Sequence, residues 1–390
     1  MKTGNDIVII GGGLMGLSIS IELQLRGANV TLLSRNFQEA AAHAAAGMLA
    51  PQAEGIQDPE FLKLALGSRA LYQDWANKLE AIAGLDPGYW PCGILAPVYQ
   101  RPESTVGSES PETPAYWCDR NTLDQRQPDL GPEVVGAWWF PQDAQVDNRR
   151  GLARTLKVAA QKLGVNLREG VEVQRLETQS LEAQTLKPQN SQGQPFEPEN
   201  SAIHPAMIIK VHTNQGTVTG AHYILATGAW SAQILPTIPV YPVKGQMLSV
   251  RVPPSPEPLP LKQVLFGSEA YIVPRRDGLI VIGATVEPHS FDPGLTPAGL
   301  QSLLSKAIRL YPALQDFPIQ DFWWGFRPTT PDQFPILGGS PFKNLTLAVG
   351  HHRNGILLAP MTAQLIADWV LEQKADPLLR QFSWHRFSMG

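Results

Sequence analysis

The chain has 390 residues, and its 31 lysines and arginines stand against 35 aspartates and glutamates, for a net charge of -4. Charged residues make up 17% of the sequence, below the roughly 25% that is usual for soluble domains. This low share favours a protein that buries much of its surface around a large ligand or in an oligomer. The sequence shows no basic run, which argues against a nucleic-acid partner, and its length predicts two or three domains.

The composition also bears on metals, membranes and the cell compartment. The two cysteines, Cys92 and Cys118, are too few for a metal cluster or a disulfide framework, and free thiols indicate a reducing compartment. No H-x-x-x-H or C-x-x-C spacing supports a metal site. No run of about 18 apolar residues predicts a transmembrane helix, and the apolar N-terminal run is too short for a signal peptide. We therefore expect a cytoplasmic protein without a metal site.

The N-terminal segment predicts a dinucleotide site. Residues 6–10 read as a buried strand, residues 14–26 read as a helix, and a G-x-G-x-x-G motif lies between them. In this order the first glycine permits a tight turn, the second lets the backbone approach a pyrophosphate, and the third lets the helix pack on the strand. The alternative is a glycine-rich turn without a ligand. The cofactor-binding residues predicted here, at the positive end of the helix, are Gly11, Gly13, Leu14, Met15 and Gly16.

The next strand, residues 29–33, completes a βαβ unit. The position after this strand usually carries an acidic residue that binds the ribose hydroxyls. Here Ser34 stands in that position, followed by Arg35. A serine hydroxyl cannot hold a diol as two carboxylate oxygens do, so the predicted contact with the ribose is weaker than that with the pyrophosphate. Three alternatives stay open for Arg35: stacking on the adenine, contact with a phosphate, or exposure to solvent.

Small residues dominate the segment 40–51. This segment reads either as an alanine-rich helix or as a wall against which a bulky planar ligand lies, because small side chains let backbone amides come close. An amphipathic helix is predicted over residues 58–83.

The pattern changes over residues 89–140, where prolines and glycines separate short apolar runs and predict a second, partly antiparallel domain. We predict an α/β fold, with a Rossmann-type cofactor domain and a discontinuous α+β substrate domain on a mixed or antiparallel sheet. Residues 187–205 are rich in Pro, Gln, Asn and Glu and read as a flexible insertion. The predicted cofactor domain covers residues 1–85, 145–235 and 326–390, and the substrate domain covers 86–144 and 236–325.

A second strand–turn–helix segment lies near the C-terminus. The apolar strand 345–349 enters a turn that opens a helix at about Gly355. A helix N-terminus presents unpaired N–H groups and about half a positive charge. Under a flavin ring, this end would stabilise the negative charge that develops at the N1/C2 carbonyl edge on reduction.

Two arginines in apolar surroundings are candidates for substrate binding. A buried arginine needs an anion, and its guanidinium matches a carboxylate in bidentate geometry. For Arg327 we favour a substrate carboxylate, whereas for Arg353 a substrate carboxylate and an internal partner stay open. Tyr271 lies on a predicted strand and either faces the same carboxylate or belongs to the core. His351 and His352 are either acid–base groups or partners of the backbone.

Eight segments stand out as a set: residues 10–16, 44–54, 226–231, 242–246, 271–275, 283–285, 325–329 and 350–360. Together they resemble the glycine oxidase group of the D-amino-acid-oxidase-like FAD amine oxidases. The resemblance covers nearly the full chain except residues 187–205. The first segment is shared by many FAD and NAD enzymes, whereas the last two are the most specific.

The resemblance implies FAD as the cofactor, held non-covalently, since related enzymes attach flavin to a late cysteine and none follows Cys118. It also implies that Arg327 binds the substrate carboxylate with help from Tyr271 and Arg353. Beyond the first turn, the residues implied to contact FAD are Ala46, Gly47, Met48, Val173, His351, His352, Arg353, Asn354, Gly355, Ile356 and Leu357. Ser34, Arg35 and Gly228 complete the predicted cofactor site, and Ser34 departs from the family pattern.

The implied reaction is oxidation of glycine, sarcosine and small D-amino acids by hydride transfer to flavin. Its products are the imine, which for glycine hydrolyses to glyoxylate and ammonia, and hydrogen peroxide formed from molecular oxygen. The group often serves synthesis of the thiamine thiazole and forms homotetramers. The alternatives are a sarcosine oxidase or D-amino-acid dehydrogenase of the same fold, an NAD-dependent dehydrogenase, and a non-catalytic flavoprotein.

Overall fold

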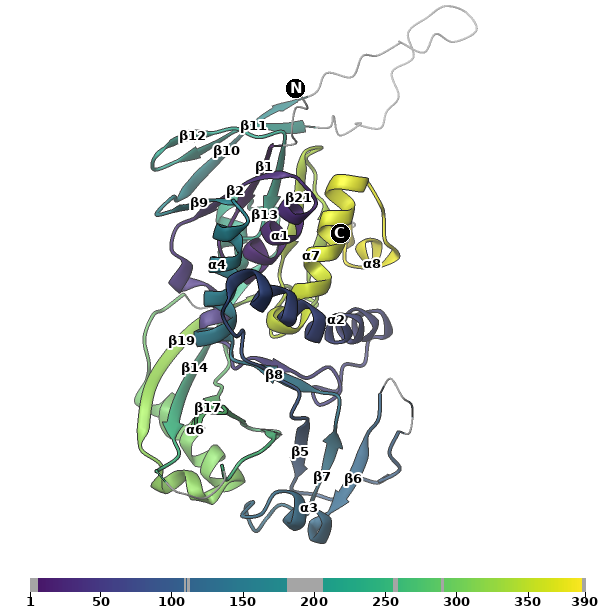
Figure 1. Cartoon of the computed structure of the whole chain (residues 1–390), viewed down its shortest axis with the longest axis vertical. Helices are drawn as coiled ribbons and strands as arrows, with labels where there is room; N and C mark the ends of the chain where they lie inside the picture. The colour runs from purple at the N-terminus through teal and green to yellow at the C-terminus, as the bar shows by residue number, and fades with distance from the viewer. Residues whose placement is uncertain are drawn as a thin grey trace, which may run out of the picture.

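The computed structural model describes residues 6–108, 110, 113–180, 206–254, 259–288 and 291–387. The predicted insertion at 187–205 lies outside these residues. A mainly parallel sheet with its helices occupies one end of the molecule, and a second, mainly antiparallel sheet occupies the other (Figure 1). The predicted α/β fold with a Rossmann-type part and a mixed second sheet is confirmed.

The first sheet has six strands, and β1 pairs in parallel with β2 on one side and with β13 on the other. The predicted strand–helix–strand unit at the N-terminus is confirmed, with α1 at Leu14–Leu25 between β1 and β2. In spatial order the strands are β20 (Ile336–Gly339), β21 (Leu345–Val349), β13 (His222–Leu225), β1 (Asp6–Ile10), β2 (Asn29–Ser34) and β9 (Asn166–Glu169).

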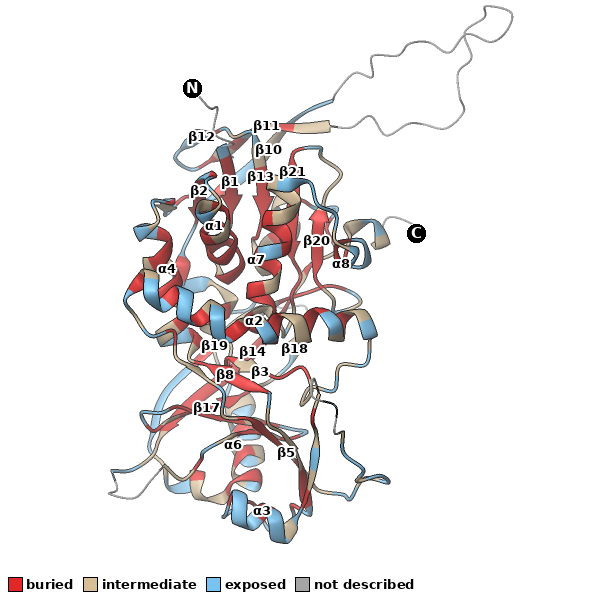
Figure 2. Cartoon of the chain, turned by 45° about the vertical axis from the view of Figure 1, so that its right-hand side comes forward, coloured by how far each residue is buried: buried red, intermediate tan, exposed pale blue. Residues whose placement is uncertain are grey.

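Alternate residues of β1 enter two different cores, as the pleat of a strand requires. Ile7 and Ile9 pack with the helices on one face, whereas Val8 and Ile10 pack with a three-stranded antiparallel sheet on the other. The helices lie side by side in Figure 2 with their red, buried sides toward the sheet. They are α1, α2 (Pro59–Ala83), α4 (Ala153–Lys162) and α7 (Gly355–Glu372); the three strands are β10 (Val173–Ser180), β11 (Ala206–Thr213) and β12 (Gly216–Val218).

By length and composition, α7 would be able to cross a membrane, yet 56% of that apolar stretch is buried inside the protein. Ile356, Leu358 and Ile366 belong to the core that α7 shares with α1 and α2. The apolar character of α7 therefore has a structural reason within the fold.

The second sheet contains nine strands, and the long strands β14 and β19 pair antiparallel over almost their whole length. Helix α6 (Pro297–Leu310) packs on this sheet through Leu303 and Leu310. In order along the sheet, the strands are β18 (Glu287–Pro288), β14 (Tyr241–Arg251), β17 (Leu279–Gly283), β16 (Tyr271–Pro274), β15 (Val264–Phe266), β5 (Ile94–Val98), β7 (Gly136–Phe140) and β6 (Tyr116–Asp119), with β19 (Ile319–Thr329) beside β14.

The segment 40–51 is not an alanine-rich helix, so that reading was wrong. It follows a 3₁₀ turn at Phe37–Glu39 and forms a second one at Ala41–His43, then the strand β3 (Met48–Leu49), which pairs with β8 (Ala144–Val146). The side-chain amide of Asn148 donates to the carbonyls of Ala42 and Ala45 and so holds the segment in this non-helical conformation. Alanine propensity for helix is a weak preference that such contacts override.

The remaining elements connect these layers. A π-helical turn at Asn148–Leu152 precedes α4. The predicted domain boundary between residues 325 and 326 falls within β19, and the domain ranges stay a prediction. The other elements are β4 (Tyr89–Trp90), α3 (Arg120–Arg126), α5 (Ser231–Ile234), α8 (Pro377–Gln381) and 3₁₀ turns at Gly228–Trp230, Pro312–Asp316 and Trp384–Phe387.

Candidate cofactor and substrate site

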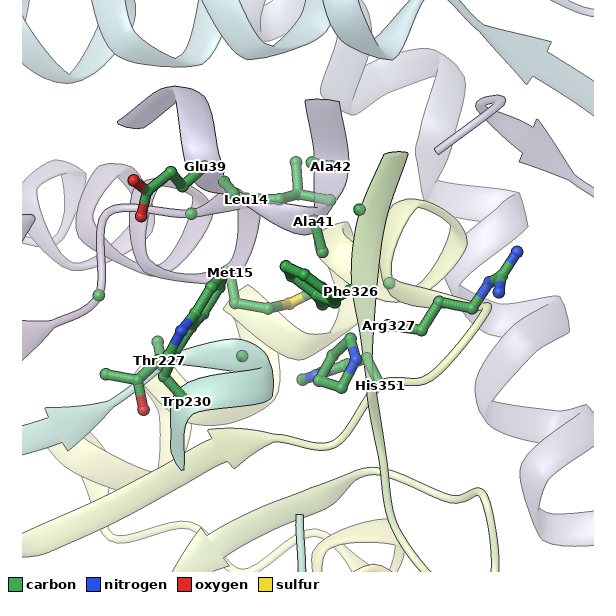
Figure 3. A pocket seen from close by; sticks show the side chains of 18 of the residues that line it. Leu14, Met15, Glu39, Ala41, Ala42, Thr227, Trp230, Phe326, Arg327 and His351 are labelled. Carbon is green, nitrogen blue, oxygen red and sulfur yellow. The ribbon is translucent and has the colours of Figure 1, made fainter. Parts of the chain in front are cut away.

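A long pocket begins at the carboxyl ends of β1 and β2 and reaches β14 and β19 of the second sheet. Figure 3 shows Met15, Phe326 and His351 among the side chains that line it. It encloses about 1750 Å³, counting open solvent at its mouth. The structure thus brings together segments that are far apart in the sequence. The predicted site residues that line it are Gly11, Gly13, Leu14, Met15, Ser34, Arg35, Ala46, Gly47, Met48, Val173, Gly228, Tyr271, Arg327, His351, His352, Arg353, Gly355 and Ile356.

The glycines of the first turn have separate structural reasons. Gly11 has a φ of 115°, and a β-carbon there would lie 2.3 Å from the Ala226 carbonyl oxygen. A β-carbon on Gly16 would lie 1.9 Å from the Gly11 carbonyl oxygen, so Gly16 lets α1 pack on the turn. At Gly13 the nearest atom would be the Ala40 β-carbon, 3.6 Å away. The protein itself would accept a side chain at Gly13, as expected where a ligand occupies the space.

The end of β2 lacks the usual acid but has one nearby. Ser34 is buried, and the Arg35 side chain pairs with Glu39 at 2.6 Å. The Arg35 guanidinium also lies 5.0 Å from the ring centroid of Trp230. Glu39 lines the pocket, so a carboxylate stands in the same wall as Ser34. Sequence reasoning missed Glu39, although an acid five residues beyond Ser34 in the same connection was a signal for it.

The other end of the pocket is organised around Arg327. In the β14–β19 register Val243 lies opposite Arg327, so Gly245, two residues along, shares the same face. The guanidinium lies over Gly245, where a β-carbon would be 2.5 Å from Nη2. Its Nη1 donates to the Thr285 carbonyl at 3.1 Å, and no carboxylate among the described residues lies within ion-pair distance. Burial lowers the pKa of Arg327, and the nearby Arg353 lowers it further.

Tyr271 and Arg353 lie beside Arg327 but differ in their partners. Burial raises the pKa of the Tyr271 hydroxyl, although Arg327 opposes this effect. The hydroxyl therefore stays protonated at neutral pH and can donate a hydrogen bond. Arg353 is 37% exposed and pairs with Glu54 at 3.5 Å. This contact supplies the internal partner that the sequence left open for Arg353, whereas Arg327 donates to backbone carbonyls and pairs with no carboxylate that the structure describes.

The two adjacent histidines are both neutral at physiological pH. His351 is buried, its Nε2 lies 3.2 Å from the Thr362 hydroxyl, and burial lowers its pKa to about 3. Burial, with help from Arg327 and Arg353, lowers the pKa of His352 to about 4. The His352 Nδ1 lies 2.8 Å from the Thr329 hydroxyl. Neither ring is an imidazolium at neutral pH, so neither acts as a general acid there.

Two helix N-termini open on the pocket. Gly13 precedes α1 and Asn354 precedes α7, and neither residue caps its helix with a side-chain hydrogen bond. Their first amides are therefore available to anionic groups. The two helix N-termini, the space at Gly13 and the small residues of segment 40–51 (the alanine segment) together fit FAD, with the pyrophosphate at α1 and the flavin toward α7.

A few predictions fall outside the pocket, and several lining residues escaped the sequence reasoning. Gly16, Asn354 and Leu357 do not line it. Trp230 and Phe326 do, with ring centroids 6.1 Å apart. Both lie within segments that carried the family resemblance, so their position was a signal. Other lining residues that were missed include Gly12, Asn36, Glu39, Glu54, Thr227, Gly245 and Met247.

Comparisons with known proteins point to one family. Residues 6–369 match the DAO family, described as FAD dependent oxidoreductase. The chain is 56% identical, over 98% of its length, to the bifunctional protein ThiO/ThiG of Trichormus variabilis, of which it spans 55%. It is 32% identical to the glycine oxidase of Geobacillus kaustophilus, with 98% of this chain and 97% of that one covered.

Solved structures agree with the sequence matches. The crystal structure of glycine oxidase from Geobacillus kaustophilus superposes with a TM-score of 0.81 at 31% identity, covering 97% of this chain and 98% of that chain. The chain spans about half the length of the ThiO/ThiG relatives that it matches. The chain belongs to the DAO family of FAD-dependent oxidoreductases, and its cofactor is FAD.

Proposed function

We propose that this protein oxidises glycine, and also sarcosine and small D-amino acids, with FAD as the electron acceptor. The observation that carries the proposal is Arg327, a half-buried guanidinium without a carboxylate partner among the described residues. It shares one pocket with the glycine turn of α1. The names of the relatives, glycine oxidase and ThiO, support the same substrate class.

The pocket residues act mainly by positioning. Arg327 holds the substrate carboxylate in bidentate geometry, and the Tyr271 hydroxyl donates to the same group. FAD, when bound, accepts the hydride from the substrate α-carbon. The amine must be neutral so that its lone pair assists this loss. His351 and His352 are neutral and leave no acid beside the amine, so orientation of the α-carbon contributes most of the rate.

The products follow from this chemistry. Loss of hydride from glycine leaves an imine, which water hydrolyses to glyoxylate and ammonia. Molecular oxygen takes the electrons and becomes hydrogen peroxide. We propose that the imine serves synthesis of the thiamine thiazole, in cytoplasm, and that the enzyme is a homotetramer with non-covalent FAD. These last points rest on the resemblance to the family.

One spectroscopic experiment tests the proposal. The purified holoprotein is mixed anaerobically with glycine, sarcosine or D-proline while its visible flavin spectrum is recorded. We expect the spectrum to bleach, and air to restore it with formation of hydrogen peroxide. Bleaching without peroxide would favour a dehydrogenase of the same fold, and an unchanged spectrum would refute amine oxidation. Acid precipitation should release all of the yellow colour.

A further inference from the structure

Three consecutive peptide carbonyls of the alanine segment are held by buried side chains from distant elements. The indole Nε1 of Trp323, on β19, donates to the Ala44 carbonyl at 3.1 Å. Asn148 Nδ2, in the π-helical turn, donates to the Ala45 carbonyl at 2.7 Å. Arg275 Nη2, just after β16, donates to the Ala46 carbonyl at 2.6 Å. The three carbonyls therefore point toward the protein interior.

This anchoring fixes the direction of three amide groups. In a planar trans peptide the N–H of the next residue points opposite to the carbonyl, and the cis bond among the described residues lies elsewhere, at Gly283–Ala284. The amides of Ala45, Ala46 and Gly47 therefore point away from the anchors. All three residues line the pocket. Within the ranges that the structure describes, these amides have no hydrogen-bond acceptor.

The position of these three amides along the pocket determines which part of the cofactor they contact. Ala40 lies next to Gly13, at the pyrophosphate turn, whereas Ala44 packs on Gly325 of β19, two residues from Arg327. The segment thus runs from the phosphate end to the substrate end. The three amides lie at the substrate end, where the reactive ring of FAD must meet the amine.

We infer that Trp323, Asn148 and Arg275 are positioning residues for FAD, and that they hold the amides of Ala45, Ala46 and Gly47 as donors to the acceptor atoms of the isoalloxazine ring. Reduction adds negative charge to this ring, so fixed donors stabilise the reduced form more than the oxidised form. The inference rests on FAD binding and is independent of which amine is oxidised.

The burial of the anchors supports this role. Arg275 is 5% exposed, and its closest carboxylate oxygen, on Asp147, is 3.9 Å away. Burial lowers the pKa of Arg275 to about 10, so it remains charged at neutral pH. Burying a charged group without a strong partner is costly. Here the buried charge of Arg275 lies next to the Ala46 carbonyl, on the opposite side of that peptide from the Gly47 amide. Its field adds to that of the amides.

The variant Trp323→Phe tests the inference with little risk to folding, because the ring remains and the donor is lost. Trp324→Phe is the matched control, since Trp324 is 39% exposed and its indole donates to no group that the structure describes. The flavin midpoint potential and the dissociation constants of oxidised and reduced FAD are measured without any amine. For Trp323→Phe we expect about tenfold weaker relative binding of reduced FAD, equal to about 30 mV for a two-electron couple.

A second variant, Asn148→Leu, removes the donor at nearly constant volume without adding a charge, and it should lower the potential in the same direction. Far-UV circular dichroism and thermal melting establish that it is folded. A wild-type potential in both variants, equal to that of Trp324→Phe, overturns the inference. If the potentials shift but wild-type protein fails to oxidise glycine, the proposed function is refuted and the inference stands.

Discussion

The two ends of the pocket are built in different ways. The pyrophosphate end is made by consecutive residues of one turn, Gly11 to Gly16, and acts through backbone amides. The substrate end is assembled from five separate segments, which contribute Glu54, Gly245, Tyr271, Arg327 and Arg353. A short motif is enough to specify the first end, whereas sheet register must be correct for the second. Substitutions should therefore affect cofactor and substrate binding separately.

The largest expected effect separates the two ends directly. Removing Arg327 leaves a substrate carboxylate without its charged partner, a loss that typically costs about 2–5 kcal/mol. We expect Arg327→Ala to raise the KM for glycine by about two to three orders of magnitude while FAD stays bound. Steady-state kinetics and the flavin absorbance measure the two quantities. Arg353→Ala should raise KM less, because Glu54 already pairs with Arg353. A near-normal KM for Arg327→Ala would contradict the assignment.

Acid should weaken the fold through the second end. His351 has a pKa of about 3 in the folded protein, below the value of about 6.5 for a free histidine. The unfolded chain binds the proton more tightly, so stability is complete above about pH 6.5 and is lost as the pH falls toward 3. The loss should reach about 3 kcal/mol at pH 4.

Urea unfolding between pH 7 and pH 4 measures this loss. His351→Asn should flatten the pH dependence, whereas the same change at the exposed His385 should not. An equal pH dependence in both variants would show that His351 does not contribute.

A substitution at the first end should affect the cofactor first. A β-carbon at Gly16 would lie 1.9 Å from the Gly11 carbonyl oxygen, so Gly16→Ala must push α1 away from the turn. We expect FAD affinity to fall at least tenfold, measured by fluorescence titration of the apoprotein. Gly27→Ala is the control: a β-carbon there meets no atom within 4 Å, although Gly27, unlike Gly16, has a positive φ. Equal affinities in the two variants would remove the special role of the turn.

The smallest effect is expected at the N-terminus of α7, where the two ends approach each other. A β-carbon at Gly355 would make ordinary contacts with His351 and Met15, at 3.6 and 3.8 Å. Gly355→Val adds branches beyond that atom and should push the flavin from the helix end. We expect a few-fold loss of flavin content or of the rate of flavin reduction, followed by stopped flow. Unchanged occupancy and rate would refute a role for this helix end.

The same contrast explains what the sequence could predict. The elements β1, α1, α2, β21 and α7 follow from local periodicity and glycine or proline boundaries, and the structure begins each within one or two residues of the prediction. The family resemblance pointed to FAD and to Arg327. Local patterns were enough wherever a single segment determines its own structure.

The rest depended on contacts between distant segments. The helical interpretation of the alanine segment, residues 40–51, was wrong because Asn148, about 100 residues later, bonds its carbonyls and holds it in a non-helical conformation. The pairing of Glu54 with Arg353 joins residues 299 positions apart. The pairing of Arg35 with Glu39 was local, but its position on the pocket wall follows from how β2 meets the glycine turn. Such contacts appear only when the sheet register is known.

The strand β19 has a further consequence for substrate range. Trp323, Gly325 and Arg327 alternate along it and share one face, with a spacing of about 7 Å between successive members. Trp323 and Gly325 contact the segment at the flavin end, and Arg327 lies at the carboxylate end. Under the proposed function, one strand therefore sets the distance between the flavin and the substrate carboxylate. We expect substitutions that change the substrate range in this fold to occur in the other walls of the pocket, while the spacing of Trp323, Gly325 and Arg327 along β19 stays constant.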